Sequence, residues 1–244
     1  MPSAMKIYNA GNRIVNTYVY RAQAGCVMVD TGYEHGFSAV VRSLKKQGIA
    51  LSDIKYVFLT HAHDDHAGFL NELLEKCPHI KIIASGKAIP TLLRGQNSFA
   101  GGCSGIGAFA FCKFMGLLGK GRHMFPPVER RHLDRFIEVS PQSLKDAEAL
   151  LEGKILFTPG HTADSISLKI GDIIFCGDAA MNGIPSFRRI TIWIEDKAQF
   201  QTSWDILAAE QAKSIYPAHG SPFDPHDLEK YTGQIAKVRL YALK

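Results

Sequence analysis

Residues 61–66 read His-Ala-His-Asp-Asp-His, a stretch in which three imidazoles and one carboxylate follow the pattern H-x-H-x-D-H. Imidazole nitrogen and carboxylate oxygen are ligands that zinc accepts at about 2 Å. Alternate residues of an extended turn point to the same side, so His61 and His63 can face one ion while Asp65 and His66 face another. The stretch predicts a metal-binding loop that serves two ions.

Three more candidate ligands share one sequence context. His161, Asp178 and His219 each follow a short apolar stretch and each has glycine beside it, in the motifs PGHT, GD and PAHG. Glycine lets the backbone approach closely without side-chain obstruction. With the first loop these residues give seven ligands, enough for two four- or five-coordinate ions that share a bridging carboxylate. The other histidines lack this context and are predicted to be surface or structural residues: His35, His79, His123, His132 and His226.

Composition sets limits on the kind of protein. A chain of 244 residues with 46% hydrophobic and 21% charged residues is predicted to form one domain, 1–244, with a sizeable core. The net charge of +5 contains no long basic run, so it demands neither nucleic acid nor an anionic membrane, and it favours a small-molecule substrate that is anionic. Five cysteines without a CxxC pair argue against a disulfide framework. The opening MPSAMKIYNA has no apolar core of secretory-signal length, so a cytoplasmic protein is expected.

The elements that position these residues alternate along the chain, which predicts an α/β fold. Strands are expected at 13–21, 26–30, 56–59, 80–84, 135–139, 154–158, 165–170, 173–176, 190–194 and 214–216, and helices at 36–47, 68–76 and 196–210 and after a cap at Asp224. The candidate ligands follow strands, where open α/β sheets place ligands. Asp30 also ends a strand. It is interpreted either as a turn former or as an acceptor for the N–H of a metal-bound histidine.

The stretch Gly95–Phe125 interrupts the alternation and is predicted to be an insertion. It holds eight glycines and five of the 14 phenylalanines, with a nearly continuous apolar helix from Ile106 to Leu118. That helix is too short to span a bilayer, which needs about 20 apolar residues. The insertion is expected to be a lid or wall that gives the metal site an apolar substrate pocket, with Phe111 and Phe114 as candidate substrate contacts. Burial of the same helix in a homodimer interface is an equally open interpretation.

A basic pair, Arg188 and Arg189, follows Asp178 by about ten residues. One interpretation places both at the rim of the site, where they bind a carboxylate or phosphate of the substrate. An exposed basic turn is the alternative.

Taken together, the motifs HAHDDH, PGHT, GD and PAHG resemble those of the metallo-β-lactamase superfamily. The resemblance implies a four-layered αβ/βα sandwich with a dinuclear metal site at one edge. By position it assigns His61, His63 and His161 to one ion and Asp65, His66 and His219 to the other, with Asp178 bridging. Two divalent ions are implied, zinc first, with iron or manganese open because they accept similar ligands.

The resemblance also implies a reaction, the attack of a metal-bridging hydroxide, oriented by Asp65, on an acyl bond. Esters, thioesters, lactones and amides of a small apolar molecule all fit. A dinuclear phosphodiesterase is the alternative, and a non-catalytic metal-binding protein is a further one. Two departures limit transfer of a substrate: His63 stands where flavodiiron proteins carry Glu, and Met181 stands where lactonases carry Tyr.

Overall fold

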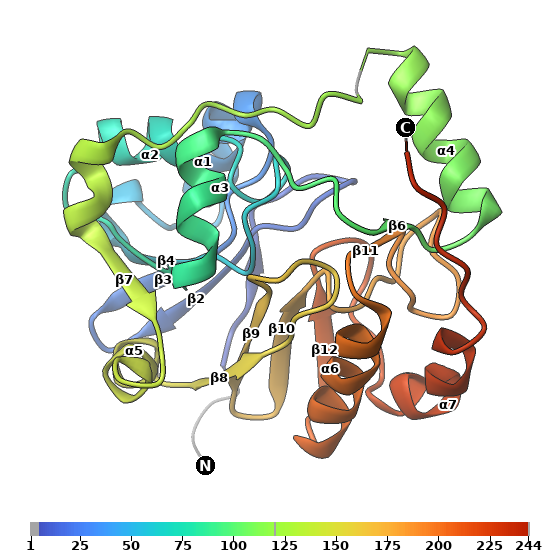
Figure 1. The fold of residues 1–244 in the computed structure, drawn as a ribbon. Helices are drawn as coiled ribbons and strands as arrows, with labels where there is room; N and C mark the ends of the chain where they lie inside the picture. The colour runs from blue at the N-terminus through green and yellow to red at the C-terminus, as the bar shows by residue number, and fades with distance from the viewer. Residues whose placement is uncertain (1–4, 120, 244) are drawn as a thin grey trace. The chain divides into compact units, whose positions relative to one another are not determined.

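The computed structural model describes residues 5–119 and 121–243. The chain divides into two compact units. The first unit runs up to Gln96 and resumes over Met124–Glu152, and the second unit contains Asn97–His123 and Gly153 onward. Each unit has its own β-sheet and its own helices (Figure 1). Whether the two units act as the single domain predicted above stays a prediction.

The first unit is built on a six-stranded sheet with strand order β1-β2-β3-β4-β5-β7. Its strands are β1 (Tyr8–Asn9), β2 (Tyr18–Ala22), β3 (Gly25–Val29), β4 (Ile54–Phe58), β5 (Lys81–Ser85) and β7 (Phe136–Val139). The pairs from β3 to β7 are parallel, and β1 to β3 are antiparallel. The carboxyl ends of β3 and β4 therefore meet at one edge, where two of the chain's polar loops begin.

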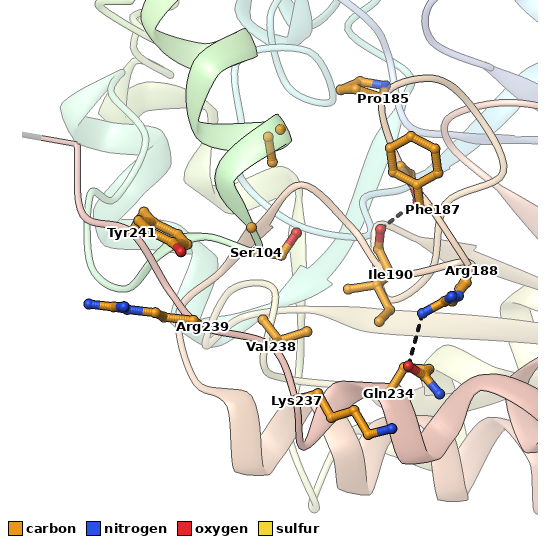
Figure 2. Close-up of a pocket in the computed structure, with 14 residues that line it drawn as sticks. Ser104, Pro185, Phe187, Arg188, Ile190, Gln234, Lys237, Val238, Arg239 and Tyr241 are labelled. Carbon is orange, nitrogen blue, oxygen red and sulfur yellow. Dashed lines mark hydrogen bonds between the residues drawn. The ribbon is translucent and has the colours of Figure 1, made fainter.

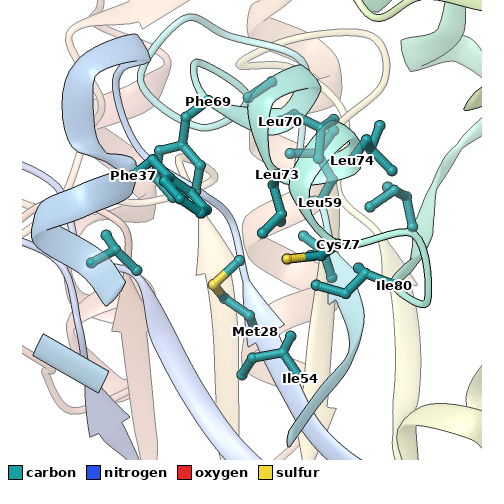
Figure 3. Close-up of a cluster of buried hydrophobic side chains, with 14 of the residues drawn as sticks. Met28, Phe37, Ile54, Leu59, Phe69, Leu70, Leu73, Leu74, Cys77 and Ile80 are labelled. Carbon is teal, nitrogen blue, oxygen red and sulfur yellow. The ribbon is translucent and has the colours of Figure 1, made fainter. Parts of the chain in front are cut away.

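Helices pack on this sheet through one apolar cluster. They are α1 (Phe37–Lys46), α2 (Leu70–Lys76), α3 (Ile89–Arg94) and α5 (Leu144–Leu151), with short 3-10 turns η1 (Glu34–Gly36), η2 (Leu51–Asp53), η3 (Gly86–Ala88) and η4 (Arg130–Arg135). In the cluster, buried side chains of α1 and α2 meet those of β3 and β4 (Figure 3). The Phe37 and Phe69 rings lie edge to face at 5.7 Å, which fixes the start of α1 beside the residue that precedes α2.

The second unit has a four-stranded sheet with order β12-β10-β9-β8 and a two-stranded sheet of β11 and β6. Its elements are β6 (Gly102–Cys103), α4 (Ile106–Leu117), β8 (Lys154–Phe157), β9 (Ile166–Ile170), β10 (Ile173–Gly177), β11 (Trp193–Ile194), α6 (Lys197–Ala209), β12 (Ser214–Pro217) and α7 (His226–Ile235). Strands β10 and β12 are parallel, so the residues after them emerge at one edge. The core includes Phe200 and Trp204 of α6, and the Trp204 indole Nε1 donates to the Ala179 carbonyl at 2.7 Å.

The segment 97–123, part of the predicted insertion, begins and ends at adjacent points of the chain. Gln96 and Met124 form an antiparallel bridge, and the Phe125 amide donates to the Gly95 carbonyl at 2.9 Å. The Asn97 amide donates to the His123 carbonyl at 3.0 Å. These paired backbones form a neck at the base of the segment. Within 5–119 and 121–243, no helix has the length and apolar character needed to cross a membrane.

The structure corrects two predicted strands. The strand expected from residue 13 begins only at Tyr18, because the Asn12 side chain accepts hydrogen bonds from the amides of Ile14 and Val15 and turns the chain before it. The strand expected at 190–194 is reduced to Trp193–Ile194, and Ile190 instead pairs with Phe187 inside the preceding loop. Helices α3 and α5 were not predicted.

Candidate metal centre

The loop after β4 carries the four candidate ligands of the first unit. His61, His63 and His66 are buried, with 1%, 8% and 0% exposure, and Asp65 is half-buried. The His61 ring centroid lies 4.6 Å from that of His63 and 3.9 Å from that of His66. Buried imidazoles this close together are costly if they carry charge, and they are well suited to share a cation.

Asp30, at the end of β3, holds this loop through three hydrogen-bonding groups. Its Oδ1 accepts from the Thr60 amide at 2.8 Å, and its Oδ2 accepts from the Thr60 hydroxyl at 2.8 Å. The Oδ2 atom also lies 2.8 Å from Nδ1 of His66. A carboxylate only accepts, so His66 donates from Nδ1 and keeps the lone pair of Nε2 for another partner. The backbone of Asp30 has a left-handed φ of +59°, a strained conformation that persists only where the surrounding structure holds it in place.

We expect Asp30→Ala to weaken metal binding by about 10–100-fold, because the His66 ring loses the partner that fixes its tautomer and direction. A zinc-chelator competition titration measures the change. Asp53→Ala is the matched control, since Asp53 is a first-unit aspartate whose side chain instead accepts from the Ala50 amide. Equal affinities in the wild type and Asp30→Ala would contradict the assignment.

The backbone of the same loop is packed too closely to admit a side chain at one position. A Cβ on Gly68 would lie 2.3 Å from the Asp64 carbonyl oxygen and 2.6 Å from that of Gly32. The Thr31 amide and hydroxyl both donate to the His66 carbonyl, at 2.8 and 2.7 Å. The loop is therefore fixed by main-chain contacts as well as by Asp30.

In the second unit, His161 follows β8 and is oriented by a backbone carbonyl. Its Nδ1 lies 2.8 Å from the Trp193 carbonyl oxygen, so Nδ1 donates and Nε2 carries the lone pair. Gly160, just before it, has φ +129°, and a Cβ there would stand 2.2 Å from the Phe200 amide nitrogen. Only glycine lets this turn lie directly against the start of α6.

Asp178, which follows β10, lies between two imidazoles of the second unit. Its Oδ2 is 3.7 Å from Nε2 of His161, and its Oδ1 is 3.5 Å from Nε2 of His219, the residue that follows β12. Each oxygen of the carboxylate thus faces a different histidine. Parallel pairing of β10 with β12 produces this juxtaposition, because it brings Asp178 and His219 to the same sheet edge.

The spacing of these donor atoms fits a bound metal ion. Two ligands held at about 2.0–2.1 Å on a tetrahedral zinc lie about 3.3 Å apart. The two distances at Asp178, and the 3.6 Å between Nε2 of His66 and Oδ1 of Asp65, are close to that value. All seven predicted ligands are among the His and Asp side chains suited to hold an ion. The donors are nitrogen and oxygen without thiolate, which suits zinc, iron or manganese.

Other residues singled out in the sequence make contacts of their own. Arg188 lines a cavity of the second unit, whereas Arg189 is paired with Asp227, its Nη2 lying 2.7 Å from Oδ2. Phe111 and Phe114 project from α4 and are 38% and 57% exposed. That these residues contact substrate stays a prediction.

Two of the histidines set aside in the sequence take part in other contacts. His132 is buried and lies 2.6 Å from Glu75 through its Nε2. His226 is exposed at the start of α7, where the Asp224 carboxylate raises its pKa through a side-chain hydrogen bond. The orienting groups that the sequence did not reveal are Thr60 and the Trp193 carbonyl. In the sequence, only its position before His61 points to Thr60. No sequence pattern points to the Trp193 carbonyl, which is 32 residues away from His161.

These features define an α/β protein in which each unit has His and Asp side chains at the carboxyl ends of its strands. The family model of the metallo-beta-lactamase superfamily matches residues 10–219. The chain belongs to this superfamily, which supports a metal-dependent hydrolase in general terms and confirms the resemblance and the α/β fold class predicted from the sequence.

Two curated relatives match most of this chain at low sequence identity. The chain is 26% identical over 212 residues to beta-lactamase-like protein 2 homolog of Caenorhabditis elegans, covering 86% of this chain and 57% of that protein. It is 25% identical over 229 residues to the metallo-beta-lactamase fold-containing protein ST1585 of Sulfurisphaera tokodaii, covering 91% of this chain and 78% of that one. The chain therefore spans little more than half the length of the nematode protein.

A solved metallo-β-lactamase with a HARLDQ motif from Cronobacter sakazakii shares the fold. It superposes with a TM-score of 0.65 at 19% identity, covering 95% of this chain and 92% of that chain. At this identity the likeness concerns the fold alone.

Proposed function

We propose that the protein is a dinuclear metal hydrolase that cleaves an acyl bond in a small molecule. The observation that carries the proposal is Asp178, whose two oxygens face the Nε2 atoms of His161 and His219 at 3.7 and 3.5 Å. A carboxylate with each oxygen directed at a different imidazole has the form of a bridging ligand. Membership of the superfamily supports the same interpretation.

The ligand assignment follows the superfamily motif. His61, His63 and His161 hold one ion, Asp65, His66 and His219 hold the other, and Asp178 belongs to both. Zinc is the first candidate because the donors are imidazole and carboxylate.

The chain's own residues keep these ligands ready for the ions. Asp30 and the Trp193 carbonyl accept from Nδ1 of His66 and His161, so both rings present a neutral Nε2. Divalent ions, when bound, supply Lewis-acid polarisation of a carbonyl and lower the pKa of water. Asp65, half-buried beside His66, is placed to accept a proton or to orient a water molecule.

A substrate panel on metal-analysed protein tests the proposal. We expect close to two ions per chain and turnover of esters, thioesters or lactones above that of bis-(p-nitrophenyl) phosphate. A chelator should abolish turnover, and added zinc, manganese or iron should restore it. Dominant phosphodiester cleavage, or full metal loading without acyl hydrolysis, would overturn the choice of substrate class.

A further inference from the structure

Helix α4 exposes one apolar face to solvent, while its opposite face packs on the rest of the second unit. The inward side chains include Phe109, whose ring lies 5.9 Å from that of Tyr241, and Cys112, whose thiol interacts with that of Cys103. Ala108 is buried on the same side. These contacts cover only the inward face of α4, and the outward face is exposed.

The outer face of α4 and its C-cap residue consists of five large apolar residues: Ile106, Phe111, Phe114, Leu117 and Leu118, the last being the C-cap. Leu117 is 87% exposed and Ile106 is 73% exposed. At about 100° per residue, the five side chains fall within an arc of about 140°. A continuous apolar stripe of this width normally faces a partner or a lipid phase.

The charged residues of the segment that carries this face have one sign. Segment 97–123 holds three Lys or Arg and no Asp or Glu. Lys113 lies on α4 itself, with its Nζ 5.6 Å from the centre of the Phe109 ring. The modest net charge of the whole chain conceals this local excess of cations.

A basic cavity of about 360 Å³ adjoins the first turn of α4. Three cations line it, Arg188, Lys237 and Arg239, and no carboxylate does (Figure 2). Arg188 donates from Nη1 to the neutral Gln234 side chain at 2.9 Å. Across the described chain none of the three cations forms a salt bridge with a carboxylate, so their charge is available to an anion.

Beside this cavity the loop exposes two more large apolar side chains. Ile184 is 98% exposed and Phe187 is 78% exposed. Arg188 follows them with a left-handed φ of +56°, a conformation that non-glycine residues seldom adopt. A phospholipid surface offers acyl chains to exposed apolar side chains and headgroup phosphates to nearby cations, so it matches this arrangement.

We propose that the outer face of α4, with the 184–188 loop, docks the protein on an anionic phospholipid surface. The apolar side chains enter the boundary between headgroups and acyl chains, and Arg188, Lys237 and Arg239 bind headgroup phosphates. Twelve residues make a helix about 18 Å long, so α4 lies in the interface and does not span it. This proposal does not rest on the proposed enzymatic function.

Charge favours lipid over a second copy of the chain as the occupant. A two-fold dimer places the same surface on both sides, so each copy would bring its cations against those of the other. An anionic bilayer has the opposite charge and attracts the same cations.

Vesicle flotation tests the proposal with the metal-loaded chain of residues 1–244. We expect binding to phosphatidylcholine vesicles that contain phosphatidylglycerol and weak binding to phosphatidylcholine alone. Phe114→Ser/Leu117→Ser should lower the partition coefficient at least about tenfold, because two large apolar side chains no longer enter the interface. Arg188→Gln/Lys237→Gln/Arg239→Gln should remove the preference for phosphatidylglycerol.

Two control variants separate this surface from general effects. Lys45→Gln/Lys46→Gln/Lys81→Gln makes the same charge change on exposed first-unit lysines and should retain the preference. Ile14→Ser/Phe157→Ser removes exposed apolar groups elsewhere and should bind normally. In Phe114→Trp, which keeps the face apolar, the new indole should shift its emission to shorter wavelength with anionic vesicles.

Absence of vesicle binding by wild type and by Phe114→Trp would overturn the proposal. A second result would also overturn it: the wild type forms a concentration-dependent dimer in sedimentation experiments, the Phe114→Ser/Leu117→Ser variant does not, and neither protein binds vesicles. That result would assign the face to a second copy.

Discussion

Replacing Asp178 with alanine should reduce bound metal from two ions per chain to one or fewer and lower hydrolysis by at least about 10²-fold. The carboxylate is buried at 6% exposure, and each of its oxygens faces a different histidine. Its loss removes the shared ligand and the negative charge that offsets two cations. Elemental analysis and turnover on one sample measure both effects.

A control on the same hairpin makes that result specific. Asp172 precedes β10 and pairs with the exposed Lys213 at 2.6 Å, so Asp172→Ala removes the same charge from the protein surface. Surface pairs of this kind contribute about 0–1 kcal/mol, and metal content and activity should be unchanged. If both variants lose metal equally, Asp178 is not a ligand.

The second large effect concerns stability. Gly160→Ala should lower the free energy of unfolding by about 3–5 kcal/mol, because a Cβ would lie inside the backbone at the start of α6 and φ is left-handed. The distances are 2.2 Å to the Phe200 amide nitrogen and 2.4 Å to its Cα. Urea unfolding followed by tryptophan fluorescence reports on this region, since Trp193 and Trp204 both lie in the second unit.

Two other glycines separate the effect of the backbone conformation from the effect of the steric clash. Gly48 has φ +73° with nothing near its missing Cβ, so Gly48→Ala should cost only about 1 kcal/mol for the backbone conformation. Gly116 lies within α4 in open space, and Gly116→Ala should stabilise slightly, by about 0.5–1 kcal/mol. A Gly160→Ala loss no larger than that of Gly48→Ala would show that the turn can move away from α6.

Short-range patterns in the sequence predicted most elements near their observed bounds. The apolar spacing over 36–47 predicted α1 at Phe37–Lys46, and Gly171-Asp172 predicted the hairpin of β9 and β10. The first strand was drawn too early because Asn12 turns the chain through its side chain, a competition that β-propensity does not register. Helix α5 was missed because only Ala147 and Leu151 are fully buried in its eight residues, which leaves a weak periodic signal.

The candidate site also has a part that the sequence predicts and a part that it does not. Its ligand residues were predictable because metal chemistry restricts their types and glycine marks their turns. The groups that orient them depend on contacts across the fold, as with the Trp193 carbonyl 32 residues from His161. Asp30 is the intermediate case. Its place at a strand end was visible in the sequence, but its bonds to the Thr60 amide and hydroxyl depend on the pairing of β3 with β4, which only the structure shows.

The neck below segment 97–123 makes that segment exchangeable. Because Gln96 and Met124 already pair antiparallel, a turn of a few residues can close the chain after excision, with little change in loop-closure entropy. The cost falls on the second unit, where β11 loses its partner β6. The first unit would keep its own backbone pairing, including the bond from the Phe125 amide to the Gly95 carbonyl. Such a junction lets evolution, or an engineer, replace one surface helix by another of different polarity while the strand ends that carry His61 and Asp178 keep their sequence.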